Sequence, residues 1–453
     1  MTGAFSPSRS PGAAESRPWK RALAWLALLA PAFFASYGFA NWVASRRADV
    51  GAIVFAWESG IPFLSWTIVP YWTIDALYGL SLFLCASRDE VDTLGKRLLL
   101  AQAICIAFFL AFPLRFTFAR PATDGVYGWM FDVLMGFDQP FNQAPSLHIA
   151  LLVILWLVYL RRLSGGWRWL VHGWLALIGA SVLTTYQHHF IDVPTGALVG
   201  WLCVWLVPDE GSSPLRAARL SRDPRRRRIA AYYAAGAAAL AALALLAGGW
   251  ALWLLWIAFS LGVVAAIYAF LDETAFQKGM DGSLSPAVRW LLAPYVAGAW
   301  LNSRWWTRAQ PAPDTVLPGL LLGRLPGPRE RAAYGFGSIV DLTAELPCVV
   351  PGVRYACVPQ LDLTVPSRDH LERAVRAIDA AMASGPVLVC CALGYSRSAT
   401  AVAAWLVATG RAEGAEQAAE QLRRVRPACV LGPELIDSVG RFAARAAGLG
   451  TSR

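Results

Sequence analysis

Residues 387–400 read VLVCCALGYSRSAT, and this stretch decides the fold of the C-terminal part of the 453-residue chain. An apolar, β-branched run ends at Cys391, a loop containing Gly394 follows, and an alanine-rich helical pattern extends from Ser398 to Gly410. A strand, a tight loop and a helix N-terminus together form a cradle of backbone N–H groups that suits a bound phosphate. The sequence therefore predicts an α/β domain with a phosphate site at the end of this strand.

Two side chains of this loop carry reactive chemistry. Cys391 lies at the floor of the predicted cradle, where the helix N-terminus and Arg397 favour the nucleophilic thiolate. The planar guanidinium of Arg397 can hold two phosphoryl oxygens at once, which a lysine cannot do. We expect Gly394 and Ser396 to complete the phosphate-binding loop.

The spacing of Cys391 and Arg397, together with Gly394 and Ser398, resembles the signature loop of cysteine-based phosphatases, the tyrosine and dual-specificity group. The resemblance to dual-specificity phosphatases covers residues 314–445. It includes two further segments, which are LPGLLLGR at 317–324 and RRVRP at 423–427. The resemblance implies a soluble α/β phosphatase domain that works through a phosphocysteine intermediate.

Such a phosphatase needs an acid that protonates the leaving oxygen and later activates water. The resemblance implies an aspartate on a loop upstream of the nucleophile, and Asp362 stands 29 positions before Cys391. Asp341 and Glu345 are the alternatives, but we expect these two residues to end a strand and start a turn. Ser398 fits the hydroxyl that helps to hydrolyse the phosphocysteine in this family.

One position departs from the family pattern. A histidine usually precedes the nucleophile, and Cys390 stands there in this chain. The sequence therefore does not predict how strongly the thiolate form of Cys391 is favoured. Adjacent cysteines pair badly in a disulfide, so we expect Cys390 to be a buried strand residue. The other cysteines of this part are expected to pack in the core, and they are Cys348, Cys357 and Cys429.

The composition indicates a membrane protein with a soluble part. Apolar residues make up 57% of the chain and charged residues only 15%, whereas soluble proteins contain about 25% charged residues. The net charge is +10, and the basic residues lie between apolar segments. They do not form a surface on which basic and aromatic residues alternate, which argues against nucleic acid as a partner. Eight cysteines without a CxxC pair predict neither a zinc site nor a disulfide framework, and we expect no metal and no cofactor.

Eight apolar segments are long enough to approach or cross a bilayer, which takes about 20 residues in a helix. The first lacks a cleavage pattern, so we expect it to be retained. A segment at 52–66, interrupted by Glu58 and Pro62, reads as interfacial. The eight predicted spans are residues 22–45, 67–87, 98–118, 145–160, 169–187, 190–207, 229–247 and 250–271.

The loops between these spans predict the orientation. With the N-terminus inside, the inner segments carry 17 Lys and Arg residues and the outer segments carry four. The positive-inside rule then places both chain ends in the cytoplasm, and we expect a multi-pass protein of the cell (inner) membrane. A segment rich in tryptophan and arginine, residues 285–308, has the composition of a helix at the membrane surface.

The predicted fold class is therefore a multi-pass α-helical membrane part of about eight spans followed by a soluble α/β cysteine-phosphatase domain. Its predicted divisions follow the changes in composition. They are a basic cytoplasmic tail at 1–21, a six-span domain at 22–207, a basic cytoplasmic loop at 208–228, two further spans at 229–271, an interfacial linker at 272–313 and the phosphatase-like domain at 314–453.

A second group of polar residues lies at the predicted outer ends of spans three to six. Asp192 follows His188 by one helical turn, so it can accept one ring N–H and leave the other ring nitrogen free to attack phosphorus. His148 is the candidate that protonates the leaving alcohol. Arg115 and Arg120 are the candidates that neutralise the phosphoryl oxygens.

This group resembles the type-2 phosphatidate phosphatase superfamily, especially the branch shared with inositol phosphorylceramide synthases, through the sequence PSLH at 145–148 and QHHFID at 187–192. The resemblance covers roughly residues 60–207. It implies His188 as the nucleophile, Asp192 as its orienting residue and His148 as the general acid. Two expected cations are missing, because Pro113 and Val182 stand where a lysine and an arginine are usual.

The resulting hypothesis is a membrane phosphatase with two phosphoryl-transfer sites, one histidine-based and facing outward, one cysteine-based and cytoplasmic. The expected partners are membrane lipids, phospholipid phosphates above all, with phosphoproteins as the open alternative. Two other functions stay open, namely a lipid head-group phosphotransferase in the membrane part and a non-catalytic lipid-phosphate sensor. A transporter is disfavoured because the chain shows neither an inverted repeat nor paired broken helices.

Overall fold

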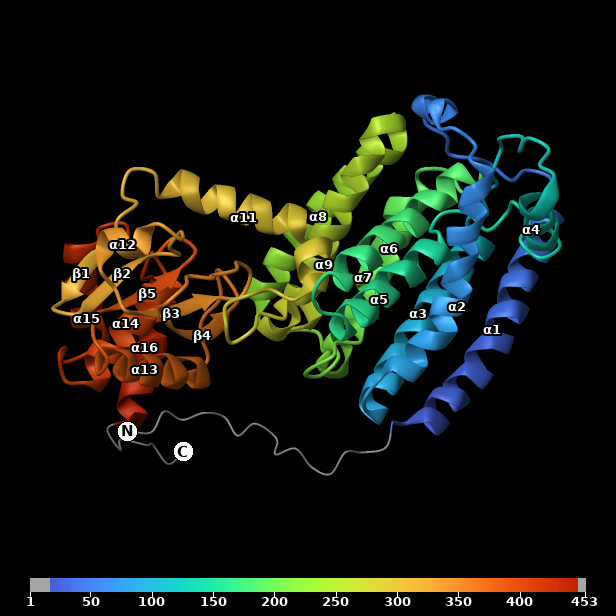
Figure 1. Cartoon of the computed structure of the whole chain (residues 1–453). Helices are drawn as coiled ribbons and strands as arrows, with labels where there is room; N and C mark the ends of the chain where they lie inside the picture. The colour runs from blue at the N-terminus through green and yellow to red at the C-terminus, as the bar shows by residue number, and fades with distance from the viewer. Residues whose placement is uncertain (1–16, 447–453) are drawn as a thin grey trace. The chain divides into compact units, whose positions relative to one another are not determined.

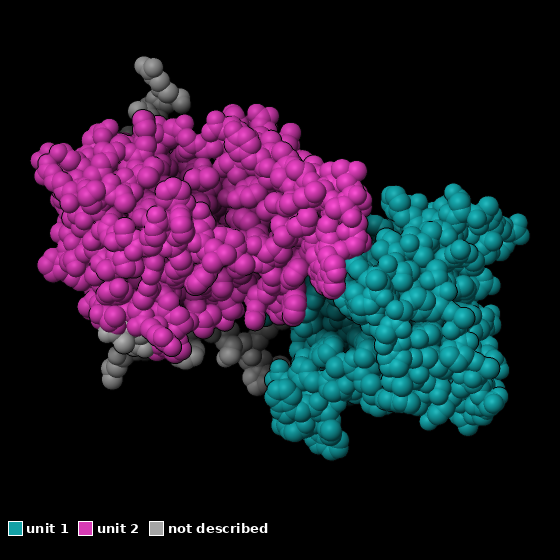
Figure 2. All heavy atoms as spheres, turned by 90° about the horizontal axis from the view of Figure 1, so that it is seen from above, with its two compact units in different colours: residues 1–213 teal, residues 214–453 magenta. Residues whose placement is uncertain are grey.

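The computed structural model describes residues 17–446, so most of the predicted basic tail and the last seven residues lie outside the described part. The chain divides into two compact units, residues 1–213 and 214–453 (Figure 2). Within residues 17–446, five helices are long and apolar enough to cross a membrane. The predicted order, an apolar helical part followed by an α/β domain, is confirmed.

The first unit is helical (Figure 1). Its helix α3 differs from the predicted third span, because it begins at Arg88 and already ends at Ala111, which leaves Arg115 in the irregular segment that follows. Helix α4 was not predicted from the sequence. The helices are α1 (Trp19–Ser45), α2 (Ile68–Leu84), α3 (Arg88–Ala111), α4 (Gly125–Met135), α5 (Leu147–Arg162), α6 (Trp167–Thr184) and α7 (Asp192–Leu206).

Two glycines let α7 approach α5 closely. A Cβ atom at Gly196 would lie 2.4 Å from the carbonyl oxygen of Ser146, and one at Gly200 would lie 2.7 Å from that of Ala150. Small residues four apart on one helix face permit this kind of contact between apolar helices. The contact also joins the starts of the two helices, where the Ser146 N–H donates to the Asp192 carbonyl at 3.1 Å.

The second unit begins with an antiparallel pair of apolar helices, α8 (Pro224–Ala247) and α9 (Leu254–Phe270). Arg226, in the first turn of α8, donates to the backbone carbonyls at the end of α9, at 3.1 Å to Ile267 and 3.2 Å to Tyr268, and also to the Leu271 carbonyl. A cation is favourable there because unpaired carbonyls give a helix C-terminus a partial negative charge. Arg226 thus fixes the end of α9 against the start of α8.

A five-stranded sheet follows, in the order β1-β2-β5-β3-β4, with β1 antiparallel and the other strands parallel. The predicted central strand is confirmed as β5, which is buried along its whole length, as expected of a parallel strand covered on both faces. The strands are β1 (Asp314–Leu317), β2 (Leu320–Arg324), β3 (Ser338–Thr343), β4 (Arg354–Gln360) and β5 (Val387–Cys391).

Helices cover both faces of this sheet. Alternate residues of a strand point to opposite faces, so Cys391 packs in the core beside α13 and α14 while Cys390 packs in a second core. Val296 and Ala299 of α11 pack against that second core, and the expectation that Cys390 is a buried strand residue is confirmed. The remaining helices are α10 (Pro286–Leu291), α11 (Ala293–Trp306), α12 (Glu330–Tyr334), α13 (Arg368–Met382), α14 (Arg397–Ala408), α15 (Ala415–Val425) and α16 (Pro433–Ala446).

The segment between α9 and the sheet is folded onto the sheet. Lys278 Nζ lies 2.6 Å from Asp341 Oδ2 with both side chains almost fully buried, and the Tyr355 hydroxyl donates to the same carboxylate at 2.7 Å. Asp341 was expected to end a strand, but it lies inside β3. Burial of this carboxylate within the strand is tolerated because it has a cation and a hydrogen bond as partners.

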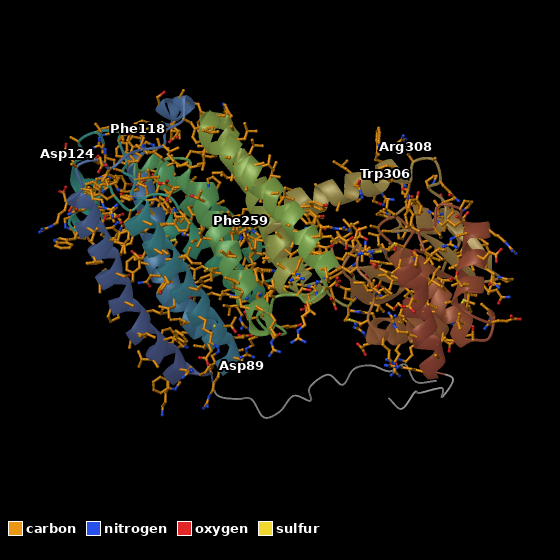
Figure 3. All side chains as sticks on the ribbon, turned by 180° about the vertical axis from the view of Figure 1, so that it is seen from behind. Asp89, Phe118, Asp124, Phe259, Trp306 and Arg308 are labelled. Atoms are coloured by element: carbon orange, nitrogen blue, oxygen red, sulfur yellow. The ribbon has the colours of Figure 1, made fainter. Side chains whose placement is uncertain are left out.

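The outward face of α11 is aromatic. Trp300, Trp305 and Trp306 are each about half exposed or more, while Ser303 on the same helix is buried and donates to the Ala392 carbonyl. Figure 3 shows Trp306 and Arg308 at the end of this helix. One face of α11 therefore supports the strand that carries the cysteines, and the other leaves tryptophans uncovered.

Candidate active site

The candidate nucleophile stands at the carboxyl end of the central strand. Cys391 is 3% exposed, and two donors point at its sulfur: the Gly394 N–H and the Ser398 hydroxyl, each 3.3 Å from Sγ. Ser396 precedes the first turn of α14. The structure thus brings the predicted nucleophile, loop glycine and hydroxyl to one point at a helix N-terminus, which is the arrangement that suits an anion.

The loop around the sulfur is fixed from two sides. Gly394 has a φ of +75°, and a Cβ there would lie 2.3 Å from the carbonyl carbon of Gly323 at the end of β2, so only glycine fits. Arg426 is fully buried and donates to the Gly394 carbonyl at 3.1 Å and to Asp314 at 2.6 Å. In the sequence, Arg426 belongs to segment 423–427, which carries part of the family resemblance. In the structure its side chain holds the loop at Gly394.

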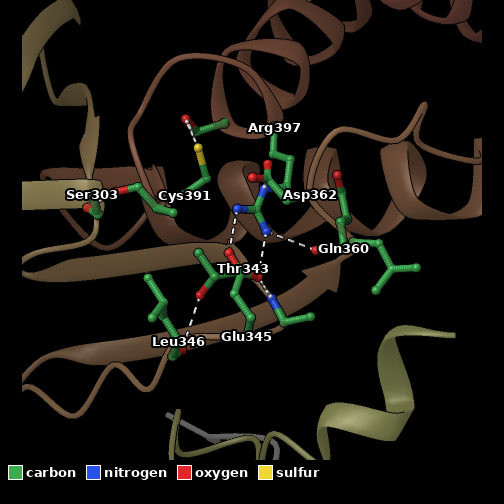
Figure 4. A network of polar contacts seen from close by, with 12 residues as sticks. Ser303, Thr343, Glu345, Leu346, Gln360, Asp362, Cys391 and Arg397 are labelled. Carbon is green, nitrogen blue, oxygen red and sulfur yellow. Dashed lines mark hydrogen bonds and ion pairs between the residues drawn. The ribbon is translucent and has the colours of Figure 1, made fainter. Parts of the chain in front are cut away.

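Arg397, the first residue of α14, is buried and held by a carboxylate (Figure 4). Its two terminal nitrogens donate to the two oxygens of Glu345 at 2.8 and 2.7 Å, and one of them also donates to the Gln360 carbonyl at 3.0 Å. Burial alone would raise the pKa of Glu345, but the charge and hydrogen bonds of Arg397 outweigh it and hold that pKa below its ordinary value. The guanidinium therefore has one fixed orientation.

Glu345 is a residue whose role sequence reasoning missed, since it was expected only to start a turn. It follows β3, which lies beside β5 in the sheet. The carboxyl ends of neighbouring parallel strands meet at one edge, where sites form in α/β folds. This rule, applied to the acidic residue just after β3, could have placed Glu345 at the site from the sequence.

Asp362 lies in the turn after β4, and the structure places it beside Arg397. Its Oδ1 is 3.2 Å from Arg397 Nε, and its side chain is 34% exposed. Partial burial raises the pKa of Asp362; the charge of Arg397 counteracts this, and Glu345 adds to it. A raised pKa keeps the carboxyl group protonated to higher pH, which is the property required of a general acid.

Together these groups can transfer a phosphoryl group. A sulfur nucleophile with a backbone N–H and a hydroxyl as donors, a buried guanidinium and a carboxyl group lie at one edge of the sheet. Within residues 17–446, no three His, Cys, Asp or Glu residues are grouped so that they could hold a metal ion.

The histidine group of the first unit also assembles. His188 Nδ1 lies 2.9 Å from Asp192 Oδ2, and His188 Nε2 lies 3.3 Å from the Ser146 hydroxyl. The predicted pairing forms, but His188 precedes α7 in an irregular turn and does not share a helix with Asp192. With Nδ1 directed at the Asp192 carboxylate, Nε2 is the ring nitrogen that faces the Ser146 hydroxyl.

His148 and His188 line a cavity of about 290 Å³ in the first unit. His148 stacks on Tyr71 with ring centroids 4.3 Å apart. The cavity also contains carboxyl groups that sequence analysis did not assign to the site, Asp75 and Asp138, and Asp138 accepts a hydrogen bond from the Tyr37 hydroxyl at 2.7 Å. Among the described residues that line it, none is an arginine or a lysine.

The two arginines predicted to bind phosphate in this unit do not line the cavity, although the charge of Arg120 interacts with Tyr71 and Asp138, which do. Arg120 donates to the carbonyls of Thr185 and Tyr186, at 3.2 and 3.3 Å, and Arg115 is exposed. Neither is among the described residues that line the cavity. Their assignment as phosphate ligands stays a prediction.

Several solved structures are similar to the C-terminal part of the chain. Human DUSP28 is 25% identical with a TM-score of 0.28, and the match covers 30% of this chain and 99% of that one. Tk-PTP in its active form is 27% identical with a TM-score of 0.28 over 30% of this chain and 99% of that one. PTPMT1 is 23% identical with a TM-score of 0.28 over 30% of this chain and 98% of that one.

A family model gives the assignment. Residues 325–444 match the model of the dual specificity phosphatase catalytic domain. This range begins directly after β2 and contains Asp362, Cys391 and Arg397. The part of the chain that carries the candidate site, residues 325–444, is therefore similar to the catalytic domain of dual specificity phosphatases, and apolar helices precede it in the sequence.

Proposed function

We propose that the chain is a membrane-bound phosphatase that hydrolyses phosphomonoesters at Cys391 through a phosphocysteine intermediate. One observation carries the proposal: the donors of Gly394 and Ser398 converge on the Cys391 sulfur beside a guanidinium that Glu345 holds in place. Neither step of the proposed reaction draws on a group outside the chain except water.

The free donors of Arg397 suit a phosphoryl group. An arginine has five N–H bonds, and Glu345 and Gln360 accept three of those of Arg397. Its buried Nε makes no hydrogen bond of good geometry, and its ion-pair partner at 3.2 Å is the Asp362 carboxyl group, which the proposed mechanism takes as protonated before the first step. The Nε–H and one terminal N–H therefore remain to bind two phosphoryl oxygens in a bidentate manner.

In the first step the Cys391 sulfur attacks phosphorus, so a P–S bond forms and the P–O bond to the alcohol breaks. Asp362 gives its proton to the leaving oxygen, and Arg397 and the loop N–H groups stabilise the charge on the remaining oxygens. In the second step water attacks phosphorus and loses a proton to the Asp362 carboxylate. The P–S bond breaks, and the Ser398 hydroxyl, 3.3 Å from Sγ, stabilises the departing sulfur.

A lipid phosphate is the substrate class that the surroundings of the loop favour. The Tyr395 hydroxyl donates to the Trp306 carbonyl at 3.2 Å, which joins the phosphate loop to the exposed tryptophans of α11. Arg308 lies 4.0 Å from the ring of Trp305, and tryptophan with arginine is typical of membrane interfaces. The loop then acts at the cytoplasmic membrane surface, on phosphomonoester head groups.

Assays with the full chain in mixed micelles test this function. We expect the protein to release phosphate from dioleoyl phosphatidate, and we expect Cys391→Ser to abolish the release that remains in a His188→Ala background. Unchanged release on adding Cys391→Ser to that background would overturn the proposed chemistry. A strong preference for a phosphotyrosine peptide over phosphatidate would keep the chemistry and assign a protein substrate in place of the lipid.

We propose a second phosphoryl-transfer site at His188, on the outer face of the membrane. The 2.9 Å contact between His188 and Asp192 beside a cavity that also contains His148 supports it. Product analysis of the Cys391→Ser protein with an alcohol acceptor present separates hydrolysis, which yields only free phosphate, from head-group transfer, which yields a new lipid. If His188→Ala changes neither product in that background, the His188 site is non-catalytic. The alternative of a lipid-phosphate sensor is then favoured for the membrane part.

A further inference from the structure

The backbone of the proposed acid is held by a residue from the apolar helix pair. Tyr268, in the last turn of α9, is 2% exposed, and its hydroxyl donates to the carbonyl oxygen of Asp362 at 3.1 Å. The side chain of the same Asp362 lies 3.2 Å from Arg397. The hydroxyl of Tyr268 thus fixes the residue that would deliver the proton.

The turn at this point needs such support. Leu363 has a φ of +58°, in the left-handed region that a leucine rarely adopts, because its Cβ crowds the backbone there. Its side chain is 64% exposed, so packing of that side chain does not fix the conformation. The carbonyl that Tyr268 binds belongs to the peptide bond between Asp362 and Leu363, which is the peptide that the unusual φ orients.

Tyr268 is itself fixed within the helix pair. Its ring packs against Tyr233 of α8 with centroids 5.8 Å apart, and Tyr233 packs at the same distance against Tyr295 of α11. Arg226 of α8 donates to the Tyr268 carbonyl. The hydroxyl therefore cannot leave Asp362 without movement of the end of α9.

We propose that Tyr268 is a positioning residue for the phosphatase reaction, and that the α8–α9 pair thereby sets the geometry of proton transfer in the catalytic domain. This inference rests on the proposed function, because it takes Asp362 as the acid. It requires that loss of the Tyr268 hydroxyl damages proton delivery and leaves nucleophilic attack intact. The damage must then depend on how much the leaving group needs a proton.

The test compares Tyr268→Phe with Tyr232→Phe in the full chain. Tyr232 is the neighbouring α8 tyrosine, 69% exposed, and serves as the matched control for the same change. With phenyl phosphate, whose leaving phenolate is strongly basic, we expect kcat of Tyr268→Phe to fall about fivefold, which is the size expected for one lost hydrogen bond. With 4-nitrophenyl phosphate, whose leaving group needs little protonation, we expect a change below about twofold.

A double variant shows whether Tyr268 acts through Asp362. In an Asp362→Asn background, we expect Tyr268→Phe to cause no further loss, because coupled residues are not additive. Equal losses on both substrates, or a full additional loss in the Asp362→Asn background, would assign Tyr268 a merely structural role. Thermal unfolding of each variant checks the fold.

The outcomes also separate this inference from the proposed function. If hydrolysis by the full chain does not depend on Cys391, the proposed function itself is wrong. If hydrolysis depends on Cys391 and Asp362 but Tyr268→Phe behaves like Tyr232→Phe, only the inference about Tyr268 is wrong.

Discussion

The two candidate sites treat charge in opposite ways. At the cysteine site the buried guanidinium of Arg397 is paired with Glu345 and lies 3.2 Å from Asp362, and the Gly394 N–H and the Ser398 hydroxyl point at the sulfur. The cavity at the histidine site is lined by Asp75 and Asp138 beside the two histidines, and by no arginine or lysine among the described residues. A phosphomonoester carries about 1.5 to 2 negative charges at neutral pH. The cysteine site offers Arg397 as a partner for that charge, whereas the described residues that line the histidine cavity include no arginine or lysine.

The difference in charge bears on which of the two sites takes a phosphomonoester. Both groups contain a nucleophile with an orienting partner, so the presence of a nucleophile does not decide the substrate. The surrounding charges do. We therefore expect hydrolysis of soluble aryl phosphates by the full chain to depend on Cys391 and to be independent of His188, whose proposed substrates are lipids.

The strongest test of the comparison removes each nucleophile in turn. We expect Cys391→Ser to lower phosphate release from soluble aryl phosphates by about a thousandfold or more, because a serine hydroxyl is far less nucleophilic than a thiolate. His188→Ala should retain at least about half of the activity. A large loss in His188→Ala with these substrates would contradict the assignment by charge.

The next effect concerns the cation that distinguishes the two sites. Arg397→Lys keeps the charge but loses the planar fork that fits both Glu345 and the phosphoryl oxygens. We expect kcat/KM for 4-nitrophenyl phosphate to fall about a hundredfold or more. Arg424→Lys on the exposed face of α15 is the control, and a comparable loss there would show that the effect is not specific.

The pH dependence examines Asp362. Because partial burial raises its pKa, the protonated acid persists to higher pH than an ordinary aspartic acid, and kcat for phenyl phosphate should fall as pH rises through that pKa. Asp362→Asn should lower kcat about a hundredfold and remove this descending limb. A descending limb that survives in Asp362→Asn would assign the titration to another group.

The smallest expected effect lies in the first unit. Gly200→Ala forces a Cβ to within 2.7 Å of the Ala150 carbonyl, so α7 must move away from α5 at a cost of about 1–3 kcal/mol. Thermal unfolding should show this loss, and phosphomonoester hydrolysis at Cys391 should be unchanged. Gly173→Ala in α6 is the matched control, since an added Cβ there meets no atom within 4 Å.

Sequence reasoning succeeded where the chemistry is local. The strand, loop and helix around Cys391 are consecutive, and the pairing of His188 with Asp192 spans only four residues, although a turn and not a shared helix brings them together. It failed where partners are distant. Glu345 contacts Arg397 across 52 positions and Tyr268 contacts Asp362 across 94. The position of Glu345 just after a strand was a usable signal, but no local pattern marks Tyr268.

The charged residues that line the histidine site were also not predicted from the sequence. The composition around His188 suggested arginines as phosphate ligands, because Arg115 and Arg120 lie near the predicted outer ends of the spans. Helix packing instead brings Asp75 and Asp138 from separate segments to the cavity. The packing of α1, α2 and α5 decides which side chains line a buried space, and a single sequence does not encode that in any short motif.

The buried pair of Lys278 and Asp341 bears on where this protein can be divided. The family match starts at residue 325, yet the cation that neutralises a carboxylate inside β3 comes from a residue upstream of that boundary. A fragment cut at 325 would lose β1 and β2, and it would also leave Asp341 with hydrogen bonds from Thr343 and Tyr355 but without its cation. Removal of one partner of a buried ion pair costs about 3–5 kcal/mol, a large share of the stability of an ordinary domain. A fragment that carries this domain should therefore begin upstream of Lys278.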